Sequence, residues 1–173
     1  MPKLSQKKVE ELKKGKLTLA QAFGVDPKQT AALLMTGHTL YEQGRYQEAK
    51  GIFEGFVVLD PANPYLHAVL GSIYQKEGRL AAAFDRYSTA VIIFPGDINS
   101  YANRGEILLK QGKLPEAAAD FKKAIALDPE KKNPAANRAR MLVAMTQQVL
   151  QIAKEKGVDA VAEMKKQIAQ QEA

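Results

Sequence analysis

The sequence predicts an all-α solenoid built from three consecutive copies of one helix–turn–helix unit. Three glycines, Gly37, Gly71 and Gly105, recur at one constant interval. A second glycine, an alanine, an aromatic residue and a proline recur in step with them. A fixed interval of about 34 residues indicates stacked helical repeats. The recurring residues are Gly44, Gly78 and Gly112, then Ala49, Ala83 and Ala117, then Phe53, Tyr87 and Phe121, then Pro61, Pro95 and Pro129.

Each recurring residue type has a structural reason. The first glycine and the alanine are small, as expected where the two helices of a unit come closest, because overpacking there costs about 1–3 kcal/mol. The second glycine can adopt a positive φ and end the first helix. The proline cannot continue the second helix, so the chain turns towards the next unit. We expect the aromatic residues to fill the space between neighbouring units.

The predicted domains are an N-terminal flank, three repeats and a C-terminal flank. Within residues 1–29 the sequence predicts two short helices. The first covers residues 5–14, and the second begins at the capping box of Thr18 and Gln21 and runs through Phe23. The block 30–131 divides into repeats at 30–63, 64–97 and 98–131. The helices expected from the repeats lie at 27–43 and 46–59, 64–77 and 80–93, and 98–111 and 114–127.

Residues 132–173 predict a capping helix and a terminal helix. A helix from Pro134 to about Lys156 has an apolar stripe of the kind that covers the open end of a solenoid. Gly157 breaks it. The last helix carries a narrow apolar seam that docks either on the cap or on another subunit. The stripe is Ala135, Ala139, Leu142, Thr146, Val149, Leu150 and Ala153, and the seam is Val158, Val161, Met164 and Ile168.

The net charge of +6 belongs to the flanks of the chain. Residues 30–131 hold eleven basic and twelve acidic residues, whereas residues 1–29 hold seven and three, and residues 132–173 hold seven and four. The aromatic residues follow the repeat positions rather than lying between basic ones. This distribution argues against a nucleic-acid partner.

The sequence contains no recognisable reaction centre. There is no cysteine, and His38 and His67 fall on different predicted helices without a second ligand at metal-binding spacing. Neither a phosphate loop nor a nucleophile elbow is present. We therefore expect a non-enzymatic protein without metal or cofactor. No apolar run approaches the roughly 20 residues of a membrane span, and the N-terminus does not read as a secretory signal, so we expect a cytoplasmic protein.

The residues at these positions resemble the tetratricopeptide repeat, which implies a right-handed solenoid whose first helices line a concave groove. Such a groove binds an extended peptide of a protein partner. In this family the second, fifth, ninth and twelfth positions of each unit face the groove. The candidate groove residues are Leu34, His38, Tyr41, Tyr65, Ala68, Ser72, Gln75, Asn99, Ala102, Glu106 and Leu109.

One subgroup of the family is excluded by this pattern. Repeat proteins that grip the C-terminal carboxylate of the large heat-shock chaperones use a clamp of Lys, Asn and Arg side chains. None of the corresponding positions here is basic, so the sequence argues against a co-chaperone of that type. These positions hold Leu34, His38, Val69, Asn99 and Asn103.

From Lys14 to Pro129 the chain also resembles the translocator chaperones of bacterial type III secretion. The similar segments are residues 14–19, 40–46 and 53–60, and Phe56 is a large apolar residue where the general repeat prefers a small one. The resemblance implies a chaperone that keeps hydrophobic translocator subunits in the cytoplasm before export. The alternative is an adaptor that organises another bacterial complex.

Two kinds of contact residue follow from the second resemblance. Tyr41 matches the groove tyrosine of these chaperones, and Tyr65 and Glu106 fall on the same face. The N-terminal helices dimerise several members of the family. A homodimer contact is therefore expected at Val9, Leu12, Leu19 and Phe23.

Overall fold

The computed structural model describes residues 4–156 and contains nine α-helices and no strand in that part of the chain. The helices are α1 (Gln6–Lys13), α2 (Leu19–Phe23), α3 (Pro27–Glu42), α4 (Tyr46–Leu59), α5 (Pro64–Lys76), α6 (Leu80–Ile93), α7 (Ile98–Lys110), α8 (Leu114–Ala126) and α9 (Pro134–Lys156). The predicted terminal helix after Gly157 lies outside the described residues.

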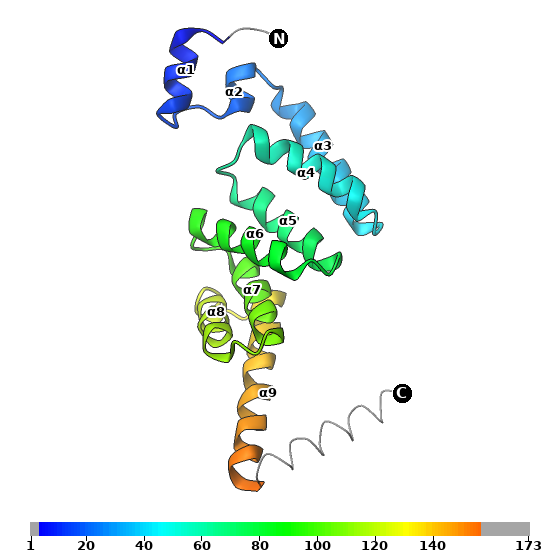
Figure 1. Ribbon diagram of the computed structural model, residues 1–173, viewed down its shortest axis with the longest axis vertical. Coiled ribbons are helices and arrows are strands. Elements are labelled where there is room, and N and C mark those ends of the chain that lie inside the picture. Colours follow the sequence, from blue (N-terminus) through cyan, green and yellow to red (C-terminus); the bar gives the residue numbers. More distant parts are fainter. Residues whose placement is uncertain (1–3, 157–173) are drawn as a thin grey trace.

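Three helix pairs stack one after another along the long axis of the molecule (Figure 1). The pairs are α3 with α4, α5 with α6, and α7 with α8, and each pair packs on the next. Helices α1 and α2 lie at one end, and α9 packs on both α7 and α8 at the other. The predicted all-α solenoid is confirmed. No helix within residues 4–156 is long and apolar enough to cross a membrane.

Local sequence signals start and end the helices as predicted. At α2, Thr18 Oγ1 accepts a hydrogen bond from the Gln21 backbone N–H at 3.2 Å, and the Gln21 side chain accepts one from the Thr18 N–H at 2.9 Å. Asp26 and Asn63 cap α3 and α5, each followed by a proline. The φ angles of the glycines that end α3, α5 and α7 are positive, between 74° and 76°.

The recurrent glycines lie directly beneath the recurrent aromatic rings. A Cβ atom added to Gly71 would lie 2.7 Å from ring atoms of Tyr87, and one added to Gly105 would lie 2.7 Å from Phe121. The same position in the first pair, Gly37, would place it 3.0 Å from Phe53. The sequence predicted these rings between units. Each ring lies against the glycine of its own helix pair. Phe53 and Tyr87 also belong to a core cluster that continues into the following pair, and Phe121 to one that continues into α9, so the rings occupy both kinds of contact.

A charged side chain joins the second and third pairs. The guanidinium of Arg104, on α7, donates two hydrogen bonds of 2.7 Å to the carboxylate of Asp120 on α8. It donates a third, of 3.2 Å, to Ser88 Oγ on α6. The ion pair is largely shielded from solvent, with side-chain exposures of 19% for Arg104 and 8% for Asp120. This bidentate geometry fixes the orientation of three helices at once.

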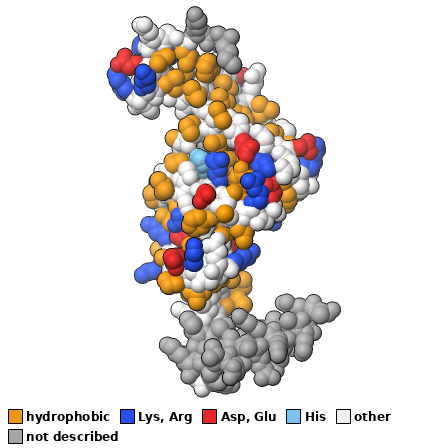
Figure 2. Space-filling model, viewed as in Figure 1, with side chains coloured by type: hydrophobic (Ala, Val, Ile, Leu, Met, Phe, Trp, Pro, Cys, Tyr) orange, Lys and Arg blue, Asp and Glu red, His pale blue; other side chains and the backbone are white. Residues whose placement is uncertain are grey.

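The N-terminal helices contact the repeats mainly where α2 meets α4. Helices α1 and α2 are tied together by the Lys8 ammonium, which donates a 2.7 Å hydrogen bond to the Ala22 carbonyl. Val9 is 36% exposed and Phe23 46% exposed. Hydrophobic side chains accordingly gather on the visible surface of this end of the molecule (Figure 2).

Replacing Gly71 with alanine should destabilise the fold. The new Cβ would overlap the Tyr87 ring, which is buried and whose hydroxyl is held by hydrogen bonds to Gln75 and Asn103. We expect the free energy of unfolding to fall by about 1–3 kcal/mol. Chemical denaturation followed by circular dichroism measures this change.

The matched control is Gly55→Ala, in the middle of α4, where an added Cβ meets nothing within 4 Å. Alanine is favoured over glycine inside a helix by about 0.5–1 kcal/mol, so this variant should be slightly more stable than the wild type. Equal stability changes in the two variants would contradict the close-approach argument.

Candidate functional site

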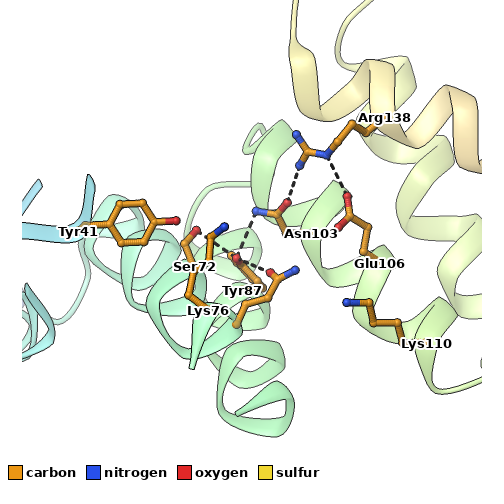
Figure 3. A pocket seen from close by; sticks show the side chains of 9 residues that line it. Tyr41, Ser72, Lys76, Tyr87, Asn103, Glu106, Lys110 and Arg138 are labelled. Atoms are coloured by element: carbon orange, nitrogen blue, oxygen red, sulfur yellow. Dashed lines mark hydrogen bonds and ion pairs between the residues drawn. The ribbon is translucent and has the colours of Figure 1, made fainter. Parts of the chain in front are cut away.

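A polar cavity of about 520 Å³ opens on the side of the solenoid formed by the first helix of each pair. Its walls come from α3, α5, α6, α7 and α9, so helices of all three repeats and of the cap contribute. The lining residues are Tyr41, Ser72, Gln75, Lys76, Tyr87, Asn103, Glu106, Lys110 and Arg138 (Figure 3).

The hydroxyl of Tyr87 organises one wall of the cavity. It donates a 2.9 Å hydrogen bond to the Gln75 side-chain carbonyl and accepts one of 3.2 Å from the Asn103 amide. Ser72 Oγ lies 3.1 Å away. Burial raises the pKa of Tyr87 to about 12, so the hydroxyl keeps its proton near neutral pH. These neutral groups of α5, α6 and α7 therefore satisfy one another.

The cavity carries an excess of positive charge. Arg138, on α9, donates to Glu106 at 3.2 Å and to the Asn103 side-chain carbonyl at 3.0 Å. Lys76 and Lys110 are exposed and form no ion pair with any residue between 4 and 156. Glu106 is the single acidic side chain among the lining residues, against three cationic ones.

Four of the candidate groove residues meet at this cavity. They are Tyr41 from α3, Ser72 and Gln75 from α5, and Glu106 from α7. Tyr41 is half-buried and its ring lies 5.6 Å from that of Tyr46. Burial, followed by the nearby Tyr46, raises the pKa of Tyr41.

Two further candidates, His38 and Tyr65, form an aromatic cluster with Phe53 outside the cavity lining. The ring of His38 lies between those of Phe53, at 5.5 Å, and Tyr65, at 5.6 Å. Tyr65 is 42% exposed. Leu34 is half-buried and packs against the core. The aromatic cluster joins the first two repeats and contains none of the cationic residues of the cavity.

The other four candidates lie outside the cavity lining. Ala102 is fully buried in the core of the third repeat and offers no surface to a ligand. Asn99 is exposed at the start of α7, and Ala68 is half-buried on α5. Leu109 lines an apolar pocket of about 230 Å³ beside the cavity.

Sequence reasoning missed the lysines and the arginine of the cavity. Lys76 follows Ser72 by four residues, and Lys110 follows Glu106 by four, so each lies one helical turn beyond a predicted groove residue. Extending the helical period by one turn would have found them. Arg138 was assigned to the cap, and no local signal indicates that the cap forms a wall of the cavity.

The two histidines have packing partners. His67 is buried, and its Nε2 lies 2.8 Å from the Pro61 carbonyl oxygen, as expected of a packing residue. Its other ring nitrogen is 3.4 Å from Arg86. Within the described residues no group of three His, Cys, Asp or Glu side chains could hold a metal ion.

Two family models of the tetratricopeptide repeat match the chain, over residues 34–98 and 98–131. Together they span more than half of its length, and the protein belongs to the tetratricopeptide-repeat family. A search of curated proteins gives no match.

The solved structures similar to this chain include type III secretion chaperones. A type III secretion complex from Aeromonas hydrophila is 26% identical, with a TM-score of 0.74, and the match covers 83% of this chain and 97% of that chain. The Yersinia enterocolitica secretion chaperone SycD, in complex with a peptide of the translocator YopD, is 22% identical with a TM-score of 0.64, covering 76% and 98%.

A repeat domain outside secretion is similar as well. The first repeat domain of Spaghetti (RPAP3), bound to the HSP90 peptide SRMEEVD, is 27% identical with a TM-score of 0.61. This match covers 71% of the present chain and 97% of that one. The fold is thus shared by proteins solved with peptides of different partners.

Removing the Tyr87 hydroxyl should lower the free energy of unfolding, and this free energy should then depend less on pH in the alkaline range. Tyr87→Phe leaves Ser72, Gln75 and Asn103 without their common partner, and we expect a loss of about 1 kcal/mol near neutral pH. In the wild type the unfolded chain releases this proton near pH 10, whereas the folded chain holds it to about 12. Stability should therefore fall across that window, and less steeply in the variant.

Denaturation measured at several pH values between about 8 and 12 tests this expectation. Tyr65→Phe is the matched control, because it removes a tyrosine hydroxyl at an exposed position and should change stability by no more than about 0.5 kcal/mol. Identical pH profiles for Tyr87→Phe and the wild type would contradict it.

Proposed function

We propose that this protein is a non-catalytic chaperone that holds an extended segment of a client protein in the cavity. The observation that carries the proposal is the cavity itself, since its walls join three repeats and α9 into one surface. Its polar wall offers side chains able to hydrogen-bond a peptide backbone. We further infer a cytoplasmic protein whose client is a secreted translocator subunit. The likeness to the Aeromonas complex, over most of both chains, supports a role in type III secretion, and the client class is suggested by the SycD chaperone of similar fold, which was solved with a peptide of the translocator YopD.

A second candidate is an adaptor that organises another bacterial complex. The 27% identity to the Spaghetti repeat domain supports it, because that domain was solved with an HSP90 peptide and not with a secretion protein. Co-expression with secretion proteins encoded beside the gene separates the two functions. A chaperone should keep an otherwise aggregating, membrane-active client in solution. Recovery of a partner that is soluble by itself would favour the adaptor.

Tyr41→Ala should weaken client binding. Tyr41 is the residue through which α3 reaches the cavity, and truncating a buried aromatic anchor typically costs an interface about 1–3 kcal/mol. Titration calorimetry with the co-purified client fragment measures the loss. Ile92→Ala is the control, since Ile92 is 77% exposed on α6 and absent from the cavity. Unchanged affinity of folded Tyr41→Ala would place the client elsewhere.

We also propose that the N-terminal helices form a homodimer contact through Val9, Leu12, Leu19 and Phe23. Val9 and Phe23 are substantially exposed, whereas Leu12 and Leu19 are half-buried. The two helices have eight and five residues, below the roughly 12–15 at which isolated helices become stable in water. A second copy of the chain would cover the exposed apolar side chains.

Deleting residues 1–23 should therefore convert a dimer into a monomer, measured by light scattering, with the circular dichroism signal of the repeats retained. The milder double variant Val9→Ser with Phe23→Ser should have the same effect because it removes the exposed apolar contacts alone. A full-length protein that is already monomeric at micromolar concentration would contradict the dimer.

A further inference from the structure

The cationic side chains of the cavity come from three different helices and converge on one space. Lys76 is at the end of α5, Lys110 at the end of α7, and Arg138 in the second turn of α9 (Figure 3). Residues 30–131 as a whole have slightly more acidic than basic residues. Lys76 and Lys110 therefore form a local excess of positive charge within near-neutral repeats, and Arg138 of α9 adds to it.

Two of these cations have no internal partner that would neutralise them. Arg138 is paired with Glu106, but Lys76 and Lys110 pair with no carboxylate in residues 4–156. Lys50, another lysine of the repeats, is paired with Glu77 at 3.1 Å. Charges that converge on a concave surface raise the local concentration of opposite charge more than isolated surface charges do.

The hydrogen-bonding groups of the wall around Tyr87 are uncharged, so Lys76 and Lys110 determine which ligand charge the cavity favours. The hydrogen-bonding groups around Tyr87 satisfy one another. A carboxylate entering between Lys76 and Lys110 would meet two ammonium groups without displacing these bonds. An ammonium group there would face a net repulsion, because Glu106 is already paired with Arg138.

An apolar pocket adjoins the charged cavity. It has a volume of about 230 Å³, and its apolar walls are Leu109, Met141 and Leu142. Glu106, Lys110 and Arg138 line both spaces, so the two are neighbours. In an extended peptide, neighbouring residues are about 3.3 Å apart and point to opposite sides. A segment with acidic and apolar residues close together could therefore occupy both spaces.

We propose that the site selects a client segment in which an acidic side chain lies close to an apolar one. The carboxylate is held by Lys76 and Lys110, with Arg138 beside them, and the apolar side chain enters the pocket of Leu109, Met141 and Leu142. This inference rests on the proposed peptide-binding function. It differs from a C-terminal carboxylate clamp because the acid is an internal side chain and the lysines stand outside the clamp positions.

Three acetylated and amidated peptides test the preference by fluorescence anisotropy. They are SLELELS, its neutral twin SLQLQLS, and SSESESS, which keeps the acids and loses the apolar residues. We expect SLELELS to bind about tenfold or more tightly than each of the others at low salt, and to lose that advantage as salt screens the charges. A fourth peptide, SLQLQLS with a free C-terminus, tests terminal carboxylate recognition.

Variants assign the effect to the cavity. Lys76→Gln with Lys110→Gln should abolish the preference for SLELELS over SLQLQLS. Lys122→Gln with Lys123→Gln is the matched control, because it removes the same charge from exposed positions on α8 and should keep the preference. Glu106→Gln should act in the opposite direction and tighten SLELELS several-fold, since it frees Arg138.

Each result tests the preference for an acidic and an apolar side chain separately from the proposed peptide-binding function. Equal binding of SLELELS and SLQLQLS, lost in Tyr41→Ala, would overturn the acidic preference and leave the groove function standing. Equal binding of SLELELS and SSESESS would overturn the apolar part. If SLQLQLS with a free C-terminus binds more tightly than SLELELS, the cavity recognises a terminal carboxylate and not an internal acidic side chain. If no peptide binds but the client co-purifies, the inference fails while the chaperone function stands.

Discussion

The contact between a glycine and an aromatic ring sets the geometry on which the remaining structure depends. In each helix pair the ring lies so close to the glycine that a single added carbon would overlap it or press hard against it. The contact fixes how near the two helices lie, and it recurs at Gly37, Gly71 and Gly105. In the second pair it also builds the site. The ring of Tyr87 covers Gly71, and its hydroxyl organises a wall of the cavity. The packing of the second helix pair and the wall of the cavity therefore share one residue, Tyr87.

Buried and half-buried charges hold the far end of the solenoid in place. Arg104 joins α6, α7 and α8 through Ser88 and Asp120. Arg140, on α9, donates a 2.9 Å hydrogen bond to Asp128 in the preceding loop. The Arg140 bond, followed by backbone N–H donors, lowers the pKa of Asp128, so this carboxylate is ionised near neutral pH. Arg140 thus ties α9 to the loop after α8, and α9 also packs on α7, where the Arg138 side chain reaches Asn103 and Glu106 of the cavity.

The resulting surface joins two chemistries on one side of the solenoid. The polar wall and the nearby cations suit the backbone and acidic groups of a peptide, while the aromatic cluster around His38 and the pocket of Leu109 suit apolar side chains. The proposed chaperone function would use both kinds of contact, since protein interfaces combine an apolar core with a polar rim. Because the repeats are close to neutral overall, the lysines Lys76 and Lys110 form a local excess of positive charge on this surface.

The sequence by itself determined the helices, their order and their ends. Three kinds of local signal predict them without tertiary structure. They are the constant repeat interval, the small residues between paired helices, and the caps at Thr18, Asp26 and Asn63. Tyr41 and Glu106 were predicted to face the groove from their position in the repeat, and both line the cavity. Only the tertiary structure decided that Ala102 is buried in the core and that Arg138, far along the chain from its partners on α7, forms part of the cavity. The reason is physical: neighbouring helices decide which side chains are covered, and long charged side chains reach across helices.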